Sequence, residues 1–213
     1  MSGPVMNNIT HIVKMILATG LFALMAACNS APDGPDGRAS VDAEPPLAGA
    51  KIGGPFTLTN QDGGTTSEAQ FKGQYRIIYF GYSYCPDVCP VDLANIMLGL
   101  KQAEKENPAL ASKIQPIFIS VDPERDTPAV LKQYVSAFHP RLIGLTGTPE
   151  EIAAVAKKYL IIYNIRKDEG STEYLVDHSR QAYLFGPDGE PLALLSFDGT
   201  PRQVADEIAR WVR

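Results

Sequence analysis

Two cysteines lie close together in the stretch GYSYCPDVCP, residues 81–90. Three residues separate Cys85 from Cys89, one more than in the common dithiol redox loop. Such a pair can form a structural disulfide, cycle between thiols and a disulfide, or bind a soft metal ion. A disulfide across so short a loop constrains the unfolded chain little, so a purely structural bridge would add only modest stability. A redox role and a metal-binding role are therefore the main hypotheses.

A metal site needs more than two thiols, and the chain has three histidines. His11 lies in an apolar N-terminal region, and His139 falls at the expected end of a helix, where a surface or capping role is the simpler interpretation. His178 directly precedes a predicted strand. Two thiolates and one imidazole suit Cu(I), which accepts three ligands, better than Zn(II), which takes four. Asp87 and Asp177 could orient these ligands, but both are equally consistent with solvated loop carboxylates.

The surrounding sequence predicts where the two cysteines lie. Residues 76–82 (RIIYFGY) are typical of a buried parallel strand, and residues 90–106 have helical spacing. Pro90 disfavours helical backbone at the residue before it and is well suited to the first helical position. We therefore expect a helix that begins at Pro90, with Cys89 at or near its N-cap and Cys85 in the preceding loop. A helix N-terminus favours negative charge, so a thiolate should form there more easily than in bulk water.

Strands and helices alternate through the rest of the chain, which predicts an α/β fold with a mixed central sheet flanked by helices. A β-α-β unit followed by β-β-α is the thioredoxin arrangement, here with an extra N-terminal hairpin. In that arrangement His178 occupies the position of the thioredoxin cis-proline and faces the cysteine loop. The expected elements are a hairpin at 55–67, strands at 76–82, 114–121 and 141–145, helices at 90–106, 127–138, 148–159 and 202–212, and two strands within 181–197.

The first 27 residues have the features of a secretory signal. Residues 15–27 (MILATGLFALMAA) are apolar, too few to span a bilayer, which takes roughly 20 residues, but suited to a signal h-region. The run ends in LMAAC, which resembles a bacterial lipobox with Cys28 as the lipidated residue, although Met25 departs from the usual Leu. An ordinary signal peptide and an uncleaved anchor stay open as alternatives. Each version places the domain outside the cytoplasm, on the periplasmic side of a bacterial membrane.

The segment after the signal predicts a linker rather than a folded unit. Residues 28–54 are rich in Pro, Gly, Ala and Asp and have few large apolar side chains, so we expect a flexible tether before a domain at 55–213. The chain has a net charge of −5 and no basic run. Nucleic-acid binding, which depends on neutralising phosphates, is therefore not expected.

Three motifs occur in order along the predicted domain: GYSYCPDVCP (81–90), SVDPERDTP (120–128) and VDHS (176–179), the last followed by YLFGPDG. Together they resemble the Sco/SenC family of copper chaperones, over residues 50–213. The resemblance implies a thioredoxin-like, membrane-anchored domain that binds copper through Cys85, Cys89 and His178. The ion would be Cu(I), with Cu(II) left open. The lipobox-like start differs from family members held by a transmembrane helix, which puts the mode of anchoring in question and leaves the chemistry unchanged.

The same resemblance implies a role in assembling the binuclear copper site of cytochrome c oxidase. The expected partners are the copper-bearing oxidase subunit, an upstream copper donor, a thiol reductant and the membrane. The second motif is largely explained by a strand end, a turn and a helix cap. Within it, Asp122 and Arg125 are the candidates for orienting the ligands or for recognising a partner.

Several other functions stay open. A tethered thiol-disulfide oxidoreductase that keeps the oxidase cysteines reduced would need only Cys85 and Cys89. A peroxidase on the same fold would need a peroxide site that no further residue marks, and a binding module stabilised by a disulfide would need no chemistry at all. His178 distinguishes the metal hypothesis, because dithiol exchange does not require an imidazole.

Overall fold

The computed structural model describes residues 43–167, 170 and 173–213. The predicted signal, Cys28 and the first part of the predicted tether lie outside the described residues. No helix within the described ranges is both long enough and apolar enough to cross a lipid bilayer. The strands are β1 (Thr57–Asn60), β2 (Thr65–Ser67), β3 (Tyr75–Gly81), β4 (Ile114–Ser120), β5 (Ile143–Thr146), β6 (Tyr163–Arg166), β7 (Leu175–His178), β8 (Ala182–Phe185) and β9 (Pro191–Leu194). The helices are η1 (Glu68–Phe71), α2 (Val88–Glu106), α3 (Pro108–Ala111), α4 (Pro128–Ser136), α5 (Pro149–Lys158) and α6 (Pro201–Trp211).

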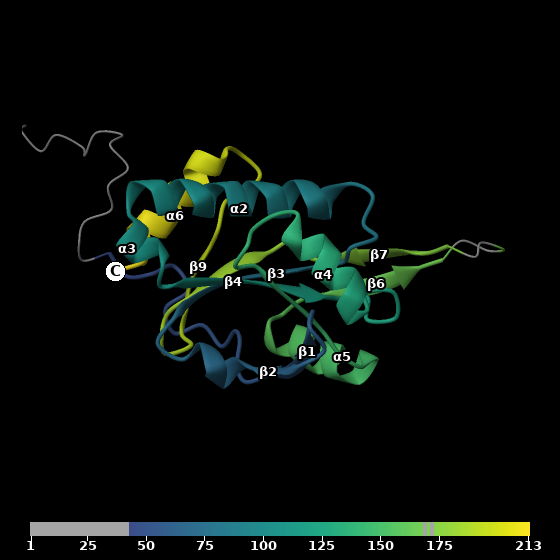
Figure 1. Ribbon diagram of the computed structural model, residues 1–213. Coiled ribbons are helices and arrows are strands. Elements are labelled where there is room, and N and C mark those ends of the chain that lie inside the picture. Colours follow the sequence, from purple (N-terminus) through teal and green to yellow (C-terminus); the bar gives the residue numbers. More distant parts are fainter. Residues whose placement is uncertain (1–42, 168–169, 171–172) are drawn as a thin grey trace, which may run out of the picture. The chain divides into compact units, whose positions relative to one another are not determined.

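Seven strands form a mixed sheet in the order β2-β1-β5-β4-β3-β8-β9 (Figure 1). The central strand β3 runs parallel to β4 and antiparallel to β8, and β4 runs parallel to β5. The units β3-α2-β4 and β8-β9-α6 reproduce the thioredoxin arrangement, and β1 and β2 form the extra hairpin at one edge. The predicted thioredoxin-like α/β fold is confirmed.

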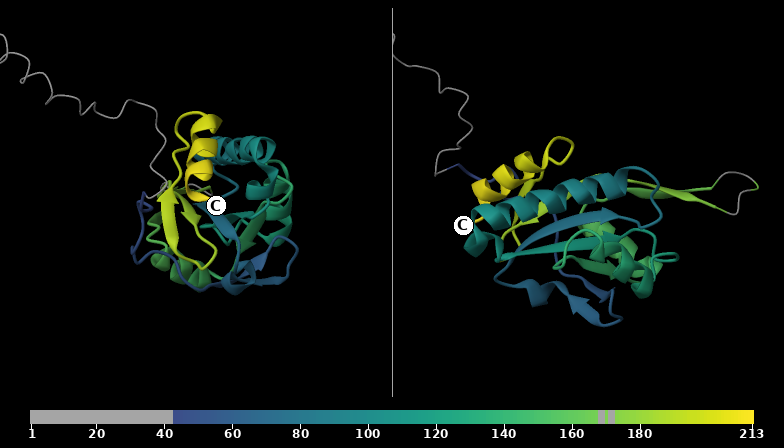
Figure 2. Two further views of the ribbon diagram at one scale, coloured as in Figure 1. Left: turned by 90° about the vertical axis from the view of Figure 1, so that its left-hand side faces the viewer. Right: turned by 45° about the horizontal axis from the view of Figure 1, so that its top comes forward.

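Helices cover both faces of this sheet because successive side chains of a strand point to opposite sides. Ile77 and Tyr79 of β3 pack in a core with α2, α4 and α6, whereas Ile78 and Phe80 pack in a second core with α5 and η1. Figure 2 shows α2 and α6 side by side on one face. Burial on both sides explains why the β3 sequence is continuously apolar instead of alternating.

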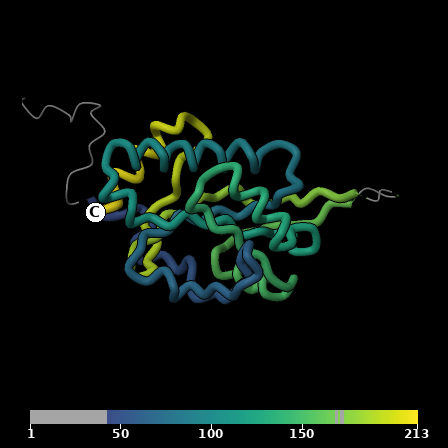
Figure 3. Tube along the Cα trace, viewed as in Figure 1, coloured from purple at the N-terminus to yellow at the C-terminus, as the bar shows by residue number. Residues whose placement is uncertain are grey.

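Strands β6 and β7 form a separate two-stranded sheet, which we call the ribbon (Tyr163–Arg166 and Leu175–His178). It extends beyond the seven-stranded sheet, as the traces in Figures 1 and 3 show. In its antiparallel register, Tyr163 lies opposite His178. The sequence predicted that His178 belongs to a loop before a strand. It is instead the last residue of strand β7.

The later part of the predicted tether packs on the domain. The backbone N–H of Leu47 donates to the carbonyl of Leu192 at 3.0 Å, and that of Gly53 donates to Lys158 at 2.9 Å. Gly53 has a φ of +91°, and a Cβ there would lie 2.7 Å from the ring of Phe185. The boundary at residue 55 is therefore corrected, because backbone hydrogen bonds and close packing hold a segment that has few large side chains.

Two helices begin where the sequence signals predicted, but one residue near a helix end is buried against expectation. Thr127 caps α4 by accepting a hydrogen bond from Val130, and Thr148 forms a capping box at the start of α5. We predicted a surface or capping role for His139, and the surface alternative was wrong. Its side chain is 1% exposed, and Nε2 lies 3.3 Å from a carboxylate oxygen of Glu104.

Candidate metal centre

Cys85 and Cys89 lie where β3 leads into α2. Cys85 is half-buried in the connecting loop, Cys89 is fully buried, and both are free thiols. We expected the helix to begin at Pro90, but α2 begins at Val88 and Asp87 is its N-cap. A proline fits anywhere in the first turn, since the N–H groups of that turn have no partner inside the helix. Cys89 consequently lies inside the first turn, near the N-cap as expected.

This shift changes which sulfur faces the helix N-terminus. The backbone N–H of Cys89 donates to Sγ of Cys85 at 3.4 Å. A free donor of the first helical turn is thus directed at Cys85 and would stabilise negative charge on its sulfur. Burial, by contrast, raises the pKa of the Cys89 thiol well above its ordinary value. The expectation that the helix end eases thiolate formation is therefore wrong for Cys89.

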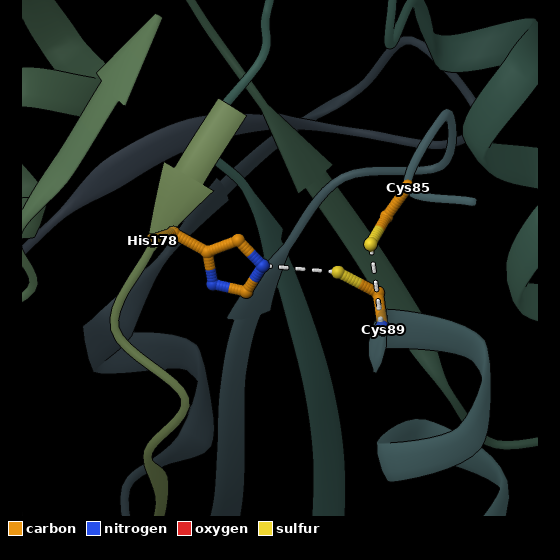
Figure 4. A group of neighbouring side chains, drawn as sticks. All are labelled: Cys85, Cys89 and His178. Atoms are coloured by element: carbon orange, nitrogen blue, oxygen red, sulfur yellow. Dashed lines mark hydrogen bonds between the residues drawn. The ribbon is translucent and has the colours of Figure 1, made fainter. Parts of the chain in front are cut away.

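His178 reaches the two sulfurs from the end of β7 (Figure 4). Its Nε2 lies 3.0 Å from Sγ of Cys89, and its Nδ1 lies 2.9 Å from the carbonyl oxygen of Ser179. Because a carbonyl only accepts hydrogen bonds, the proton of the ring sits on Nδ1. Burial also lowers the pKa of His178 below its ordinary value, which favours the neutral ring. Nε2 then offers its lone pair to the cysteines.

Two tyrosines flank the imidazole. The ring centroids of Tyr79 and Tyr82 lie 6.4 and 5.9 Å from that of His178, with interplanar angles of 83° and 85°. The Tyr82 hydroxyl also accepts a hydrogen bond from the backbone N–H of Val176, at 3.2 Å. These edge-on contacts restrict the orientation of the His178 ring.

The three donor atoms match the requirements of one soft ion. Metal–thiolate bonds are about 2.3 Å long, so three ligands around one ion lie about 4 Å apart. Sγ of Cys85, Sγ of Cys89 and Nε2 of His178 all lie within 4.8 Å of one another. No carboxylate belongs to this cluster of described residues. The donor set therefore fits three-coordinate Cu(I) better than Zn(II), as the sequence predicted.

Asp122 and Arg125, the candidates from the second motif, form a clasp beside this site. Nε of Arg125 donates to the buried carboxylate of Asp122 at 2.5 Å, and Nη1 donates to the carbonyl of Tyr174 at 2.9 Å. The guanidinium carbon also lies 3.6 Å from the ring centroid of Tyr174 and 5.0 Å from that of Tyr84. Tyr84 precedes Cys85, and Tyr174 leads into the strand that carries His178. The clasp thus joins both sides of the metal centre.

The other two predicted carboxylates lie elsewhere. Asp87 is exposed and makes no capping hydrogen bond. Asp177 is 61% exposed, and its carboxylate lies 3.7 Å from Arg166 across the ribbon. Neither belongs to the cluster of Cys85, Cys89 and His178, which agrees with the alternative interpretation of solvated carboxylates.

Sequence reasoning did not single out Asp92. It lies three residues after Cys89, on the same side of α2, and its side chain is 3% exposed. One signal for Asp92 was available in the sequence. It is an acidic residue on a helical face whose other positions are apolar. The partner of its carboxylate, Arg180, gave no local signal because 88 positions separate the two residues.

Comparison with known proteins assigns the family. The model of the SCO1/SenC family matches residues 44–213. The chain belongs to the SCO1/SenC family. It is 43% identical to the mitochondrial protein SCO2 of Saccharomyces cerevisiae over 150 residues, which covers 70% of this chain and 49% of that protein. It is likewise 43% identical to SenC of Rhodobacter capsulatus over 161 residues, 76% of this chain and 71% of SenC. The chain therefore spans about half the length of the yeast relative.

Solved structures of the family share the fold. ScoI of Bradyrhizobium japonicum, determined with copper bound, is 41% identical, with a TM-score of 0.68, over 76% of this chain and 99% of ScoI. BsSco is described as a cytochrome c oxidase assembly protein with a disulfide switch. It is 31% identical, with a TM-score of 0.61, over 78% of this chain and 94% of BsSco. Copper is thus bound by a close structural relative of this chain.

Proposed function

We propose that this protein binds copper through Cys85, Cys89 and His178 and delivers it to the binuclear copper site of cytochrome c oxidase. The observation that carries the proposal is the convergence of the His178 imidazole with both sulfurs within 4.8 Å. A dithiol that only exchanged disulfides would not need an imidazole lone pair directed at Cys89. The copper-bound ScoI relative and the description of BsSco support the choice of ion and of target.

Delivery follows from the unequal exposure of the ligands. Cys89 is fully buried, whereas Cys85 is half-buried, so an acceptor thiolate approaches the ion from the Cys85 side. Each acceptor thiolate replaces one ligand of this chain, and the released sulfur takes up the proton that the acceptor thiol lost. The copper ion keeps its oxidation state throughout. Oxidation of the two thiols to a disulfide would remove the site, and acid would compete with copper for the sulfurs.

The proposed location follows from the N-terminal sequence and the bacterial relatives. We place the domain on the periplasmic side of a bacterial membrane, anchored through a lipid on Cys28 after removal of residues 1–27. The partners in this proposal are the copper-bearing oxidase subunit, an upstream copper donor and a thiol reductant. Retention in the membrane fraction by the natural chain, and its loss in Cys28→Ser, would support lipid anchoring.

Anaerobic Cu(I) competition titrations of the reduced full-length chain test the metal site. Cys85→Ser, Cys89→Ser and His178→Ala should each weaken binding by at least about tenfold, or about 1.4 kcal/mol. Asp177→Asn is a matched control, because Asp177 adjoins His178 but faces Arg166, and it should bind as the natural chain does. Copper transfer to a soluble oxidase domain with a reduced dithiol site then tests delivery. A loaded protein that never passes its copper to that acceptor refutes the delivery step.

A thiol-disulfide oxidoreductase is the second candidate function. The two free sulfurs lie within 4.8 Å of each other, and BsSco is described as having a disulfide switch. In this case the chain would keep the oxidase cysteines reduced without carrying copper. If His178→Ala binds Cu(I) as tightly as the natural chain and reduces the acceptor disulfide at full rate, the oxidoreductase function replaces the copper-carrying one.

A further inference from the structure

The segment that follows His178 is fixed to the cysteine-bearing helix by an ion pair between Arg180, whose side chain is 41% exposed, and the buried carboxylate of Asp92. Arg180 donates from Nε to Oδ2 of Asp92 at 2.8 Å and from Nη2 to Oδ1 at 2.6 Å. The planar guanidinium therefore binds the carboxylate through two parallel hydrogen bonds, which restrict orientation as well as distance. The Tyr79 hydroxyl donates to the same carboxylate at 2.9 Å. Asp92 lies one helical turn after Cys89, and Arg180 lies two residues after His178.

This ion pair acts on the peptide group that orients the imidazole. The carbonyl of Ser179 accepts the Nδ1–H of His178, and that carbonyl belongs to the peptide bond between Ser179 and Arg180. Anchoring Arg180 on α2 consequently anchors the acceptor that sets the orientation of the ring. The other hydrogen bonds of Ser179 go to Ile162, at the start of the ribbon, and so fix the segment to the ribbon rather than to the helix.

We infer that Arg180 is a positioning residue of the metal centre, which helps to hold Nε2 of His178 at Cys89 by binding Asp92. This inference rests on the proposed copper function and deepens it. The two cysteines depend on the loop and on α2, so they stay in place without Arg180. The imidazole loses its anchor on α2. Loss of Arg180 therefore removes the contribution of His178 while leaving the dithiol intact.

Two measurements on the full-length chain test this role, with Arg180→Gln as the variant. In the reduced, metal-free protein, nuclear Overhauser effects between the His178 ring and the β-protons of Cys89 should disappear. In Cu(I) competition titrations, affinity should fall by about tenfold, as for loss of other residues that orient metal ligands. In a His178→Ala background, the same substitution should cause no further loss. Arg202→Gln removes an exposed ion pair with Asp206 and should change neither measurement.

Opposite results overturn the inference. It fails if Arg180→Gln keeps the Overhauser effects or the natural Cu(I) affinity, or if it weakens binding equally with and without His178. Should Arg180→Gln not fold because Asp92 is left as an unpaired buried charge, the double variant Asp92→Asn, Arg180→Gln takes its place with the same expected results. If His178→Ala itself binds copper as the natural chain does, the proposed function fails, and the Overhauser measurement still decides the role of Arg180.

Discussion

The clasp around Arg125 should contribute a large part of the stability of this domain. Arg125→Met removes the hydrogen bonds to Asp122 and to the carbonyl of Tyr174 while keeping an apolar stem. Removing one partner of a buried ion pair costs about 3–5 kcal/mol. Arg125 is 17% exposed, and Asp122, which is 1% exposed, keeps a 2.7 Å hydrogen bond from the Tyr174 hydroxyl. We therefore expect a loss at or below the lower end of this range, about 2–3 kcal/mol.

Urea unfolding of the reduced, metal-free chain measures this loss. Trp211 is the only tryptophan and is buried against the domain core, so its fluorescence reports unfolding. The free-energy change follows from the shift in midpoint if the urea dependence stays the same. Arg202→Met is the control, since Arg202 is 56% exposed and pairs at the surface with Glu106 and Asp206. It should cost less than about 1 kcal/mol.

A double-mutant cycle separates the ion pair from the aromatic stacking. In an Asp122→Asn background the buried charge is gone, so Arg125→Met should cost about 1–2 kcal/mol less than in the natural chain. Stacking on Tyr174 and Tyr84 is unchanged between the two backgrounds. A loss below about 1 kcal/mol in the natural chain, or equal losses in both backgrounds, would refute the argument that Arg125 acts mainly by compensating Asp122.

Two further predictions concern packing and pH. In Gly99→Ala the new Cβ would lie 2.5 Å from Cβ of Val204, so overpacking between α2 and α6 should outweigh the better helix propensity and cost about 1–2 kcal/mol in urea unfolding. The cost should shrink in a Val204→Gly background, which lacks that Cβ, and an equal cost there would contradict this reasoning. Burial lowers the pKa of His139, so the unfolded chain protonates first, and the free energy of unfolding should fall as the pH drops below about 6.5. In a His178→Ala background, His139→Gln should make the free energy of unfolding depend less on pH in this range. An unchanged pH dependence would exclude His139 as its source.

The elements of the main sheet could be predicted because their patterns report burial directly. The continuous apolar run of β3 and the Thr127 cap of α4 both appear in the structure as expected. The ribbon strand β6 was missed because residues 164–166 are exposed, and so the strand shows neither an apolar run nor alternation. The start of α2 was misplaced by two residues because Pro90 is equally acceptable at later positions of the first turn.

The candidate site, like the fold, could be predicted only in part from the sequence. Cys85 and Cys89 are local in sequence, and His178 followed from the expected thioredoxin arrangement, in agreement with the family resemblance. The contacts that hold them could not be predicted, because the partners are distant along the chain. Asp92 and Arg180 are 88 positions apart, and the Arg125–Tyr174 contact spans 49. No spacing rule connects such residues, and only the packed fold shows that each pair meets.

The ligands of the proposed copper site are therefore anchored by two different means. Cys89 sits in the first turn of a long helix packed against β3, so moving its sulfur requires disruption of the main core. His178 sits on a ribbon outside the seven-stranded sheet, connected to the domain by hydrogen bonds such as those at Val176 and Arg180. Elements held by few links open at lower free energy than the core. If the protein delivers copper as proposed above, this arrangement lets the imidazole be released at a lower cost than the buried sulfur of Cys89, which retains the ion until an acceptor thiolate is in place.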